Sequence, residues 1–156
     1  EIIRLPADAE PDETMRKLWD AQIVPVCSPG YLANHGPAQS ADQICGLDLI
    51  HTLGYENDWH RWARIYASPT AVVNSGFSVD GLVISIEAAC RGEGVILGRK
   101  PLINTYLQEG RLVEALPRNP GLKTTYFLKT ALRAPGRRPI KVLADWIVSQ
   151  ARPELQ

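Results

Sequence analysis

The chain has 156 residues, and 45% of them are hydrophobic, which is enough to bury one ordinary core or two small ones. Seventeen basic residues balance seventeen acidic ones, which argues against a surface built to neutralise nucleic-acid phosphates. The longest apolar run, residues 81–90, is interrupted by Glu87 and falls short of the roughly 20 residues of a membrane span, so we expect a cytoplasmic protein without a membrane segment.

The cysteines and histidines give no sign of a metal site. The cysteines are odd in number, widely spaced and set in apolar sequence, which favours buried free thiols over disulfides or zinc ligands. The histidines lack ligand spacing such as one helical turn. These residues are Cys27, Cys45, Cys90, His35, His51 and His60. We therefore expect neither a metal nor a cofactor.

The first predicted elements are a hairpin and a short helix. Residues 14–27 alternate polar and apolar side chains around Asp20 and Ala21, which predicts two strands joined by a turn there. Pro25 lacks an N–H group and therefore suggests an edge strand or an interruption. Ser28 is placed to cap a helix over residues 29–35, which starts with Pro29 and ends near Gly36.

The middle of the chain alternates helices and strands. Ser40 and Gln43 predict a capped helix over 41–45, followed by strands over 47–53 and 70–75. Between these strands, Asp58 is placed to cap a helix over 57–66. Its aromatic face is more typical of core packing than of a stacking platform for bases, because basic residues do not alternate with the rings. That face consists of Trp59, Trp62, Ala63 and Tyr66.

The rest of the chain continues the α/β pattern. Asp80 is placed to cap a helix that Gly92 ends, and Pro101 opens another that Gly110 ends. Predicted strands cover 94–98, 111–116 and 124–132, and a turn over 133–138 leads into a last helix over 139–151. The expected packing face of that last helix is Ile140, Leu143, Ile147 and Ala151. Such α/β sheets place ligand clefts beside the carboxyl ends of their strands.

No catalytic motif is visible. The glycines of residues 92–98 are not in the order of a dinucleotide-binding fingerprint, and they precede a strand instead of following one. The chain also lacks a nucleophile elbow, a P-loop lysine and a local base beside Ser28. We therefore expect that the protein is not an enzyme.

Two stretches offer polar groups for a small ligand. Ser28, at a helix start with free N–H groups, would suit a carboxylate, although it could equally serve only to cap its own helix. Residues 74–81 offer Asn74, Ser75 and Ser78 around Phe77. Ordinary turn chemistry with an Asp80 cap explains that second stretch as well.

Several segments together resemble the effector-binding domain of LysR-type transcriptional regulators. They occur in the family's order over almost the whole chain, and the closest likeness is to the subgroup of glycine-cleavage and β-lactamase regulators. They are "IVPVCSPGYLANHGP", the pair Trp59 and Trp62, "FSVDGLVISIEAACRGEGVILGRKPLINTYLQEGRLVEAL" and "KVLADWIVSQA".

The resemblance implies a periplasmic-binding-protein-like α/β fold of two lobes with mixed sheets. Residues 24–27 match the first crossing strand between the lobes, and residues 124–130 match the second. Residues 1–27 would then be a remnant of lobe I with the first crossing, 28–123 lobe II, and 124–156 the second crossing and the return to lobe I. The first lobe would be incomplete, and the DNA-binding domain would lie outside this chain.

The resemblance also implies a function. A small-molecule effector, for which a carboxylate is a suitable chemistry, would bind between the lobes and change the arrangement of a homodimer or homotetramer on promoter DNA. Carried over by position, the effector-binding residues are Ser28, Phe77, Ser78, Val79 and Tyr126. An alternative is a solute-binding receptor of a transport system, since the same two-lobe architecture serves there.

Overall fold

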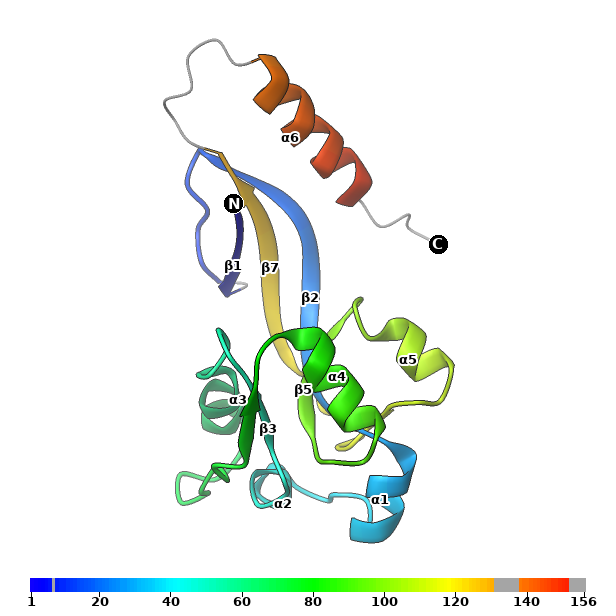
Figure 1. Cartoon of the computed structure of the whole chain (residues 1–156). Helices are drawn as coiled ribbons and strands as arrows, with labels where there is room; N and C mark the ends of the chain where they lie inside the picture. Colours follow the sequence, from blue (N-terminus) through cyan, green and yellow to red (C-terminus); the bar gives the residue numbers. More distant parts are fainter. Residues whose placement is uncertain (7, 131–137, 152–156) are drawn as a thin grey trace. The chain divides into compact units, whose positions relative to one another are not determined.

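The computed structural model describes residues 1–6, 8–130 and 138–151, and it has the mixed α/β organisation that the sequence predicts (Figure 1). The strands are β1 (Ile2–Pro6), β2 (Met15–Cys27), β3 (Ile50–Thr52), β4 (Phe77–Val79), β5 (Ile96–Lys100), β6 (Val113–Glu114) and β7 (Leu122–Lys129). The helices are α1 (Pro29–His35), α2 (Ala41–Cys45), α3 (Asp58–Tyr66), α4 (Leu82–Cys90), α5 (Asn104–Gln108) and α6 (Arg138–Ala151).

The described strands form two sheets. One has five strands in the order β1-β7-β2-β5, with β6 paired to β2, and the other pairs β3 with β4 in parallel. The chain divides into two compact units. Unit 1 is Glu1–Ala21 with Lys123–Gln156, and unit 2 is Gln22–Leu122. The long strand β2 therefore contributes residues to both units.

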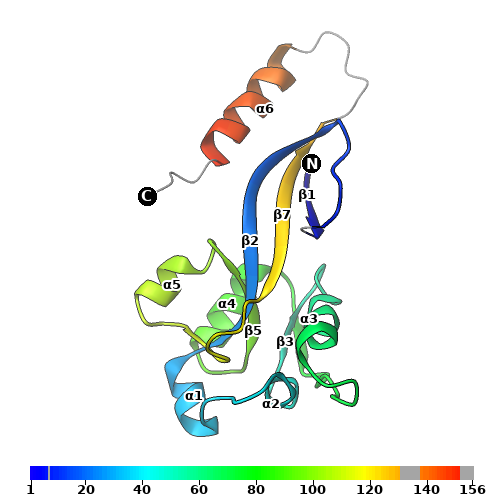
Figure 2. The same ribbon diagram turned by 180° about the vertical axis from the view of Figure 1, so that it is seen from behind.

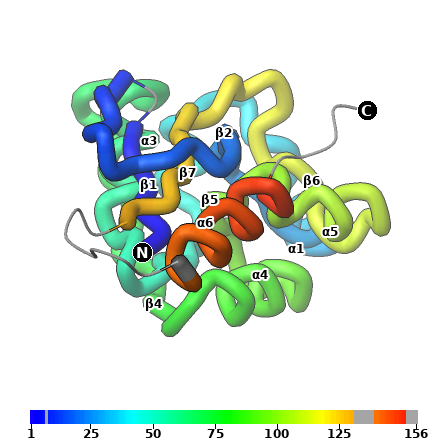
Figure 3. The backbone as a smooth tube through the Cα atoms, turned by 90° about the horizontal axis from the view of Figure 1, so that it is seen from above, coloured from blue at the N-terminus to red at the C-terminus, as the bar shows by residue number. Residues whose placement is uncertain are grey.

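Unit 1 has a small core of its own. Within it, β7 lies between β1 and the first part of β2, as the view along the sheet shows (Figure 3). Trp19 stacks on Tyr126 with 5.0 Å between ring centroids. The core and the residues packed on it are Leu18, Trp19, Ala21, Tyr126, Leu128, Ala144, Ile147, Val148 and Ala151.

The packing face of α6 differs from the predicted one. Ile147 and Ala151 pack on the unit 1 core as expected, but Ile140 and Leu143 are 41% and 55% exposed. Ala144, which is buried, replaces them in the core. The apolar positions of this helix cover more than one face, so spacing alone did not identify the face that packs.

Unit 2 has a sheet that is covered on both faces. In β2, Ile23 and Cys27 belong to one core cluster while Val24 and Val26 belong to the other, which is the period of two expected of a strand buried on both sides. The first cluster contains the aromatic residues of α3, and the second contains residues of α4. The two opposite views show α4 over one face and α3 toward the other (Figures 1 and 2).

Local signals in the sequence located most helix ends correctly. Ser28 accepts a hydrogen bond from the backbone N–H of Tyr31 at 3.1 Å, and α1 ends before Gly36, whose φ is +75°. Ser40 caps α2 in the same way, with 3.3 Å to the N–H of Gln43. These caps satisfy N–H groups that have no partner within a helix.

The aromatic side of α3 is a packing face, as expected. Trp59 and Trp62 are 2% and 0% exposed, and their rings meet edge to face at 5.8 Å. The indole N–H of Trp59 donates to the carbonyl of Ile50 at 3.2 Å, which joins α3 to β3. Buried tryptophans with satisfied N–H groups are not available to stack on bases.

Two strand predictions are wrong. The hairpin predicted over residues 14–27 is instead one continuous strand, β2 (Met15–Cys27), and the side chain of Asp20 there accepts a hydrogen bond from Thr125 of β7 at 2.7 Å. Residues 70–75 form no strand, because their backbone makes only isolated bonds such as Asn74 N–H to the carbonyl of Cys45 at 2.9 Å. Strand β1 was not predicted at all.

Two predicted helix caps are also wrong. Asp58 is the first residue of α3 and not its N-cap, which is Asn57, and the Asp58 carboxylate is buried against Arg99. Helix α4 begins after Gly81, whose φ is +90°, and has no side-chain cap from Asp80. The helix predicted to open at Pro101 begins later, as α5 at Asn104. Most of the turn predicted over 133–138 lies outside the described residues.

Candidate functional site

The carboxyl ends of three strands meet along one edge of unit 2. Strands β3 and β4 run in parallel with Thr52 opposite Val79, and Leu49 forms a parallel bridge with Val95 just before β5. The three strands therefore point in one direction. In open α/β sheets this edge is where ligands bind. Gly76 permits the pairing, because a Cβ atom there would lie 1.8 Å from the carbonyl oxygen of Leu49.

A hydroxyl pair lies at this edge. The hydroxyl oxygens of Thr52 and Ser85 are 2.6 Å apart, and Ser85 also donates to the carbonyl of Gly81 at 3.1 Å. Since a serine hydroxyl has one proton, Thr52 is the donor between the two hydroxyls. The oxygen of Thr52 therefore keeps acceptor capacity for another group.

A buried ion pair lies next to the hydroxyl pair. The guanidinium Nη2 of Arg99 is 2.9 Å from the Oδ2 of Asp58, and the two residues are 1% and 3% exposed. Arg99 also donates through Nη1 to the carbonyl of Leu97 at 3.3 Å. The pair joins β5 to the start of α3 on the inside of unit 2.

One nitrogen of the Arg99 guanidinium, Nε, has no hydrogen-bond partner among the described residues. The Cζ atom of this guanidinium lies 3.9 Å from the ring centroid of Tyr55. Arg99 also lines a cavity of about 10 Å³, which is room for one water molecule. The cavity is lined by Ile50, Thr52, Tyr55, Asp58, Trp59, Leu97 and Arg99. A buried donor without a hydrogen-bond partner is a favourable place for a polar acceptor group.

Ser28 lies at the opposite end of the strands. It follows the end of β2, which runs antiparallel to β5 with Val26 opposite Ile96, so it stands beside the amino end of β5. Its hydroxyl is buried, caps α1 and lies close to Gly92, where a Cβ atom would be 3.4 Å away. The structure therefore does not bring Ser28 together with the hydroxyl pair at Thr52.

Phe77, Ser78 and Val79 form strand β4 instead of the predicted loop. Phe77 is 42% exposed and Ser78 is exposed, while Val79 packs on the core near α4. Strand β4 ends at Val79, opposite Thr52, so this stretch does reach the edge of the sheet where ligands bind. Tyr126, the remaining predicted residue, belongs to β7 in unit 1 and is buried against Trp19.

Thr52, Ser85 and the Asp58–Arg99 pair were not predicted from the sequence. A signal for the pair existed, because Arg99 ends the apolar run of β5 and a buried arginine needs a partner. The partner could not be identified, since Asp58 lies 41 residues away. Thr52 and Ser85 are single hydroxyls in ordinary contexts and gave no signal.

The cysteines of the described residues are free thiols. Burial raises the pKa of the Cys27 thiol to about 11, so it stays protonated and a poor nucleophile at neutral pH. Among the residues that the structure describes, no group of histidine, cysteine and acidic side chains could hold a metal ion. None of the described helices is both long and apolar enough to span a membrane.

A family model described as the LysR substrate binding domain matches residues 2–152. Curated relatives in Escherichia coli K12 include the HTH-type transcriptional regulator DsdC, 36% identical over 104 residues, which cover 62% of this chain and 32% of that protein. The glycine cleavage system transcriptional activator of the same strain is 25% identical over 146 residues, which cover 92% of this chain and 47% of that one. The chain thus spans less than half the length of these relatives.

Solved structures share the fold. The regulatory domain of CrgA, a LysR-type transcriptional regulator from Neisseria meningitidis, is 22% identical with a TM-score of 0.74, covering 97% of this chain and 75% of that one. The effector domain of the transcriptional regulator AmpR of Pseudomonas aeruginosa is 16% identical with a TM-score of 0.68, covering 96% and 70%.

Proposed function

Because the chain belongs to the LysR substrate-binding domain family, whose model matches residues 2–152, we propose that it is the effector-sensing part of a transcriptional regulator. It binds a small molecule, and binding shifts the regulator between two arrangements on promoter DNA. The observation that carries the proposal is this match, together with the likeness to regulatory domains of known structure.

The proposal extends to the oligomeric state, the compartment and the DNA contact of the whole regulator. The whole regulator acts as a homo-oligomer in the cytoplasm and contacts DNA through a part outside this chain. A solute receptor of a transport system is not favoured, because the relatives named above are transcriptional regulators. The same names support a role other than catalysis.

We place the effector at the carboxyl ends of β3, β4 and β5 in unit 2. The general preference of α/β sheets for ligands at this edge supports the choice, and so do the free acceptor at Thr52 and the Nε–H donor of Arg99. Ser78 and Val79 border the same edge on β4. Ser28 and Tyr126 remain candidate contacts, which the variants Ser28→Ala and Tyr126→Phe test.

The two polar groups favour an amino acid or a related small carboxylate. An ammonium group could donate to the hydroxyl oxygen of Thr52, and a carboxylate could accept from the Nε–H of Arg99. The present cavity of about 10 Å³ is too small for such a ligand. Binding at Arg99 therefore requires side chains that line this cavity to move aside.

A calorimetric screen tests the proposal on the intact regulator. Amino acids, aromatic acids and cell-wall peptides are titrated in turn, and promoter occupancy is measured with each compound that binds. A ligand must prefer one arrangement by about 1.4 kcal/mol to shift the population tenfold. If no compound binds and promoter occupancy responds to none of them, the proposal fails.

Variants then locate the site. Thr52→Val removes the hydroxyl at nearly constant volume and should weaken the binding of amino acids, while Ser85 keeps its bond to the carbonyl of Gly81. Ser149→Ala is the matched control, because that serine is exposed on α6 and bonds only to the carbonyl of Trp146. Equal affinity in both variants would remove Thr52 from the site and leave the regulatory function itself untouched.

A further inference from the structure

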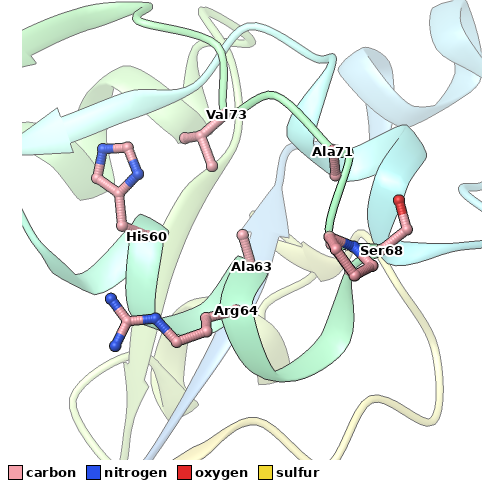
Figure 4. A pocket seen from close by; sticks show the side chains of 8 residues that line it. His60, Ala63, Arg64, Ser68, Ala71 and Val73 are labelled. Atoms are coloured by element: carbon pink, nitrogen blue, oxygen red, sulfur yellow. The ribbon is translucent and has the colours of Figure 1, made fainter.

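Unit 2 contains a second and larger cavity, away from the strand edge. Its volume is about 380 Å³, within the range of small-molecule sites, and it lies between α3 and the segment that follows that helix. Figure 4 shows the side chains around it, which are His60, Ala63, Arg64, Ala67, Ser68, Pro69, Ala71 and Val73. None of them lines the small cavity beside Arg99.

The floor of this cavity is apolar and firmly supported. Ala63 belongs to the first core cluster of unit 2, and Ala67, Ala71 and Val73 pack against it. The alanine side chains are short, which leaves a hollow over a closely packed core where larger residues would fill the space. An apolar floor of this kind would take a compact hydrocarbon group.

The rim of the cavity is basic on one side. His60 and Arg64 are four residues apart on α3 and therefore share a face of the helix. Figure 4 shows both side chains along the same side of the cavity, with Ser68 across from them. Both are exposed, and among the described residues neither side chain has an ion pair or hydrogen bond.

The other side of the cavity has its polar groups already paired. The hydroxyl and backbone N–H of Ser68 both donate to the carboxylate of Asp42, at 2.6 and 2.8 Å. These hydrogen bonds lower the pKa of Asp42, so the carboxylate is charged at neutral pH. The charged carboxylate of Asp42 disfavours an anionic ligand near Ser68. The negative group of a ligand would therefore lie on the side of His60 and Arg64.

We propose that this cavity is a second binding site, for a small organic carboxylate with a compact apolar body. The carboxylate pairs with the guanidinium of Arg64 and the imidazole of His60, and the hydrocarbon part covers the floor formed by Ala63, Ala71 and Val73. Inorganic phosphate fits less well, because it would make no use of that floor. This proposal does not depend on the effector site at Thr52.

Nuclear magnetic resonance of the ¹⁵N-labelled chain tests it, with benzoate and isobutyrate as probes. Each acid is titrated beside its uncharged amide, benzamide or isobutyramide, which has a similar shape. With the two acids we expect saturable chemical-shift changes confined to the backbone N–H groups of residues 60–73. Benzamide and isobutyramide should bind much more weakly. Equal binding of acids and amides, or shifts elsewhere only, would overturn the proposal.

Variants separate charge from shape. Arg64→Gln should raise the dissociation constant for benzoate about tenfold or more, since it removes a charge-assisted hydrogen bond. Arg91→Gln is the matched control, because Arg91 is an exposed arginine of the same unit that does not line the cavity. An unchanged affinity in Arg64→Gln would contradict the proposal.

A third variant fills the hollow. Ala71→Leu places a larger side chain over the floor and should abolish binding of benzoate, while the thermal unfolding of the variant reports whether the fold is kept. If this variant does not fold, the benzoate affinity of Arg64→Gln still tests the proposal. Thr52→Val should leave benzoate binding at residues 60–73 unchanged, and a loss of binding there would show that the two sites are one.

Discussion

Replacing Arg99 by methionine should strongly destabilise unit 2. The change leaves the carboxylate of Asp58, which is 3% exposed, without its partner at 2.9 Å. Breaking a buried pair in this way costs about 3–5 kcal/mol, a large part of the total stability of about 5–15 kcal/mol that is usual for a domain. Arg61, whose Nη1 lies 3.9 Å from the other carboxylate oxygen, should keep the loss toward the lower figure.

Urea unfolding of the chain and its variants measures this cost. The double variant Asp58→Asn with Arg99→Met should lose less than the single Arg99→Met, because it leaves no buried charge. Arg111→Met is the control, since the Arg111–Glu87 pair is 43% and 41% exposed and such pairs contribute about 0–1 kcal/mol. A loss in Arg99→Met no greater than in this control would show that the buried pair contributes no more than an exposed one.

Three further predictions concern stability. Ser28→Ala removes the cap of α1 and should cost about 0.5–2 kcal/mol in denaturant unfolding; a change in effector response without any such cost would instead favour a binding role. Gly98→Ala should cost about 1–3 kcal/mol in the same assay, because the new Cβ would lie 2.7 Å from the Cδ1 of Ile103, and an unchanged midpoint would contradict that packing. The side chain of Lys17 donates a hydrogen bond to Asp20 and holds the pKa of the Asp20 carboxyl below the ordinary 3.8. The pair therefore stabilises the fold above pH 3.8, and this contribution is lost as the pH falls through the lowered pKa. Asp20→Asn should therefore reduce the loss of stability between neutral and acidic pH, and parallel pH curves for variant and parent would contradict this.

The elements that the sequence predicted well are those set by local chemistry. Ser28 and Ser40 each stand three residues before the N–H group that they cap, and Gly36 stands where α1 ends. These signals lie within one or two turns of chain, and at Ser28, Ser40 and Gly36 no distant contact overrides them. The aromatic face of α3 was readable for the same reason.

The features that the sequence did not reveal depend on distant residues. The turn predicted at Asp20 is replaced by a continuous strand, in which Asp20 bonds to Thr125, 105 residues further along the chain. Asp58 has the residue type and the position of a cap, and only the fold places it beside Arg99. At the candidate site, Val79 was predicted from the family resemblance. Thr52 could be recognised as a candidate only once the directions of the strands were known.

Chemical-shift mapping of an amino-acid effector on this chain tests the claim that the effector binds at the carboxyl ends of the strands in unit 2. If the claim is right, the amides that shift are those of residues 52–55 and 79–85, at the carboxyl ends of β3 and β4. Shifts concentrated at the amino end of the strands instead, around Ser28 and Gly92, would contradict it.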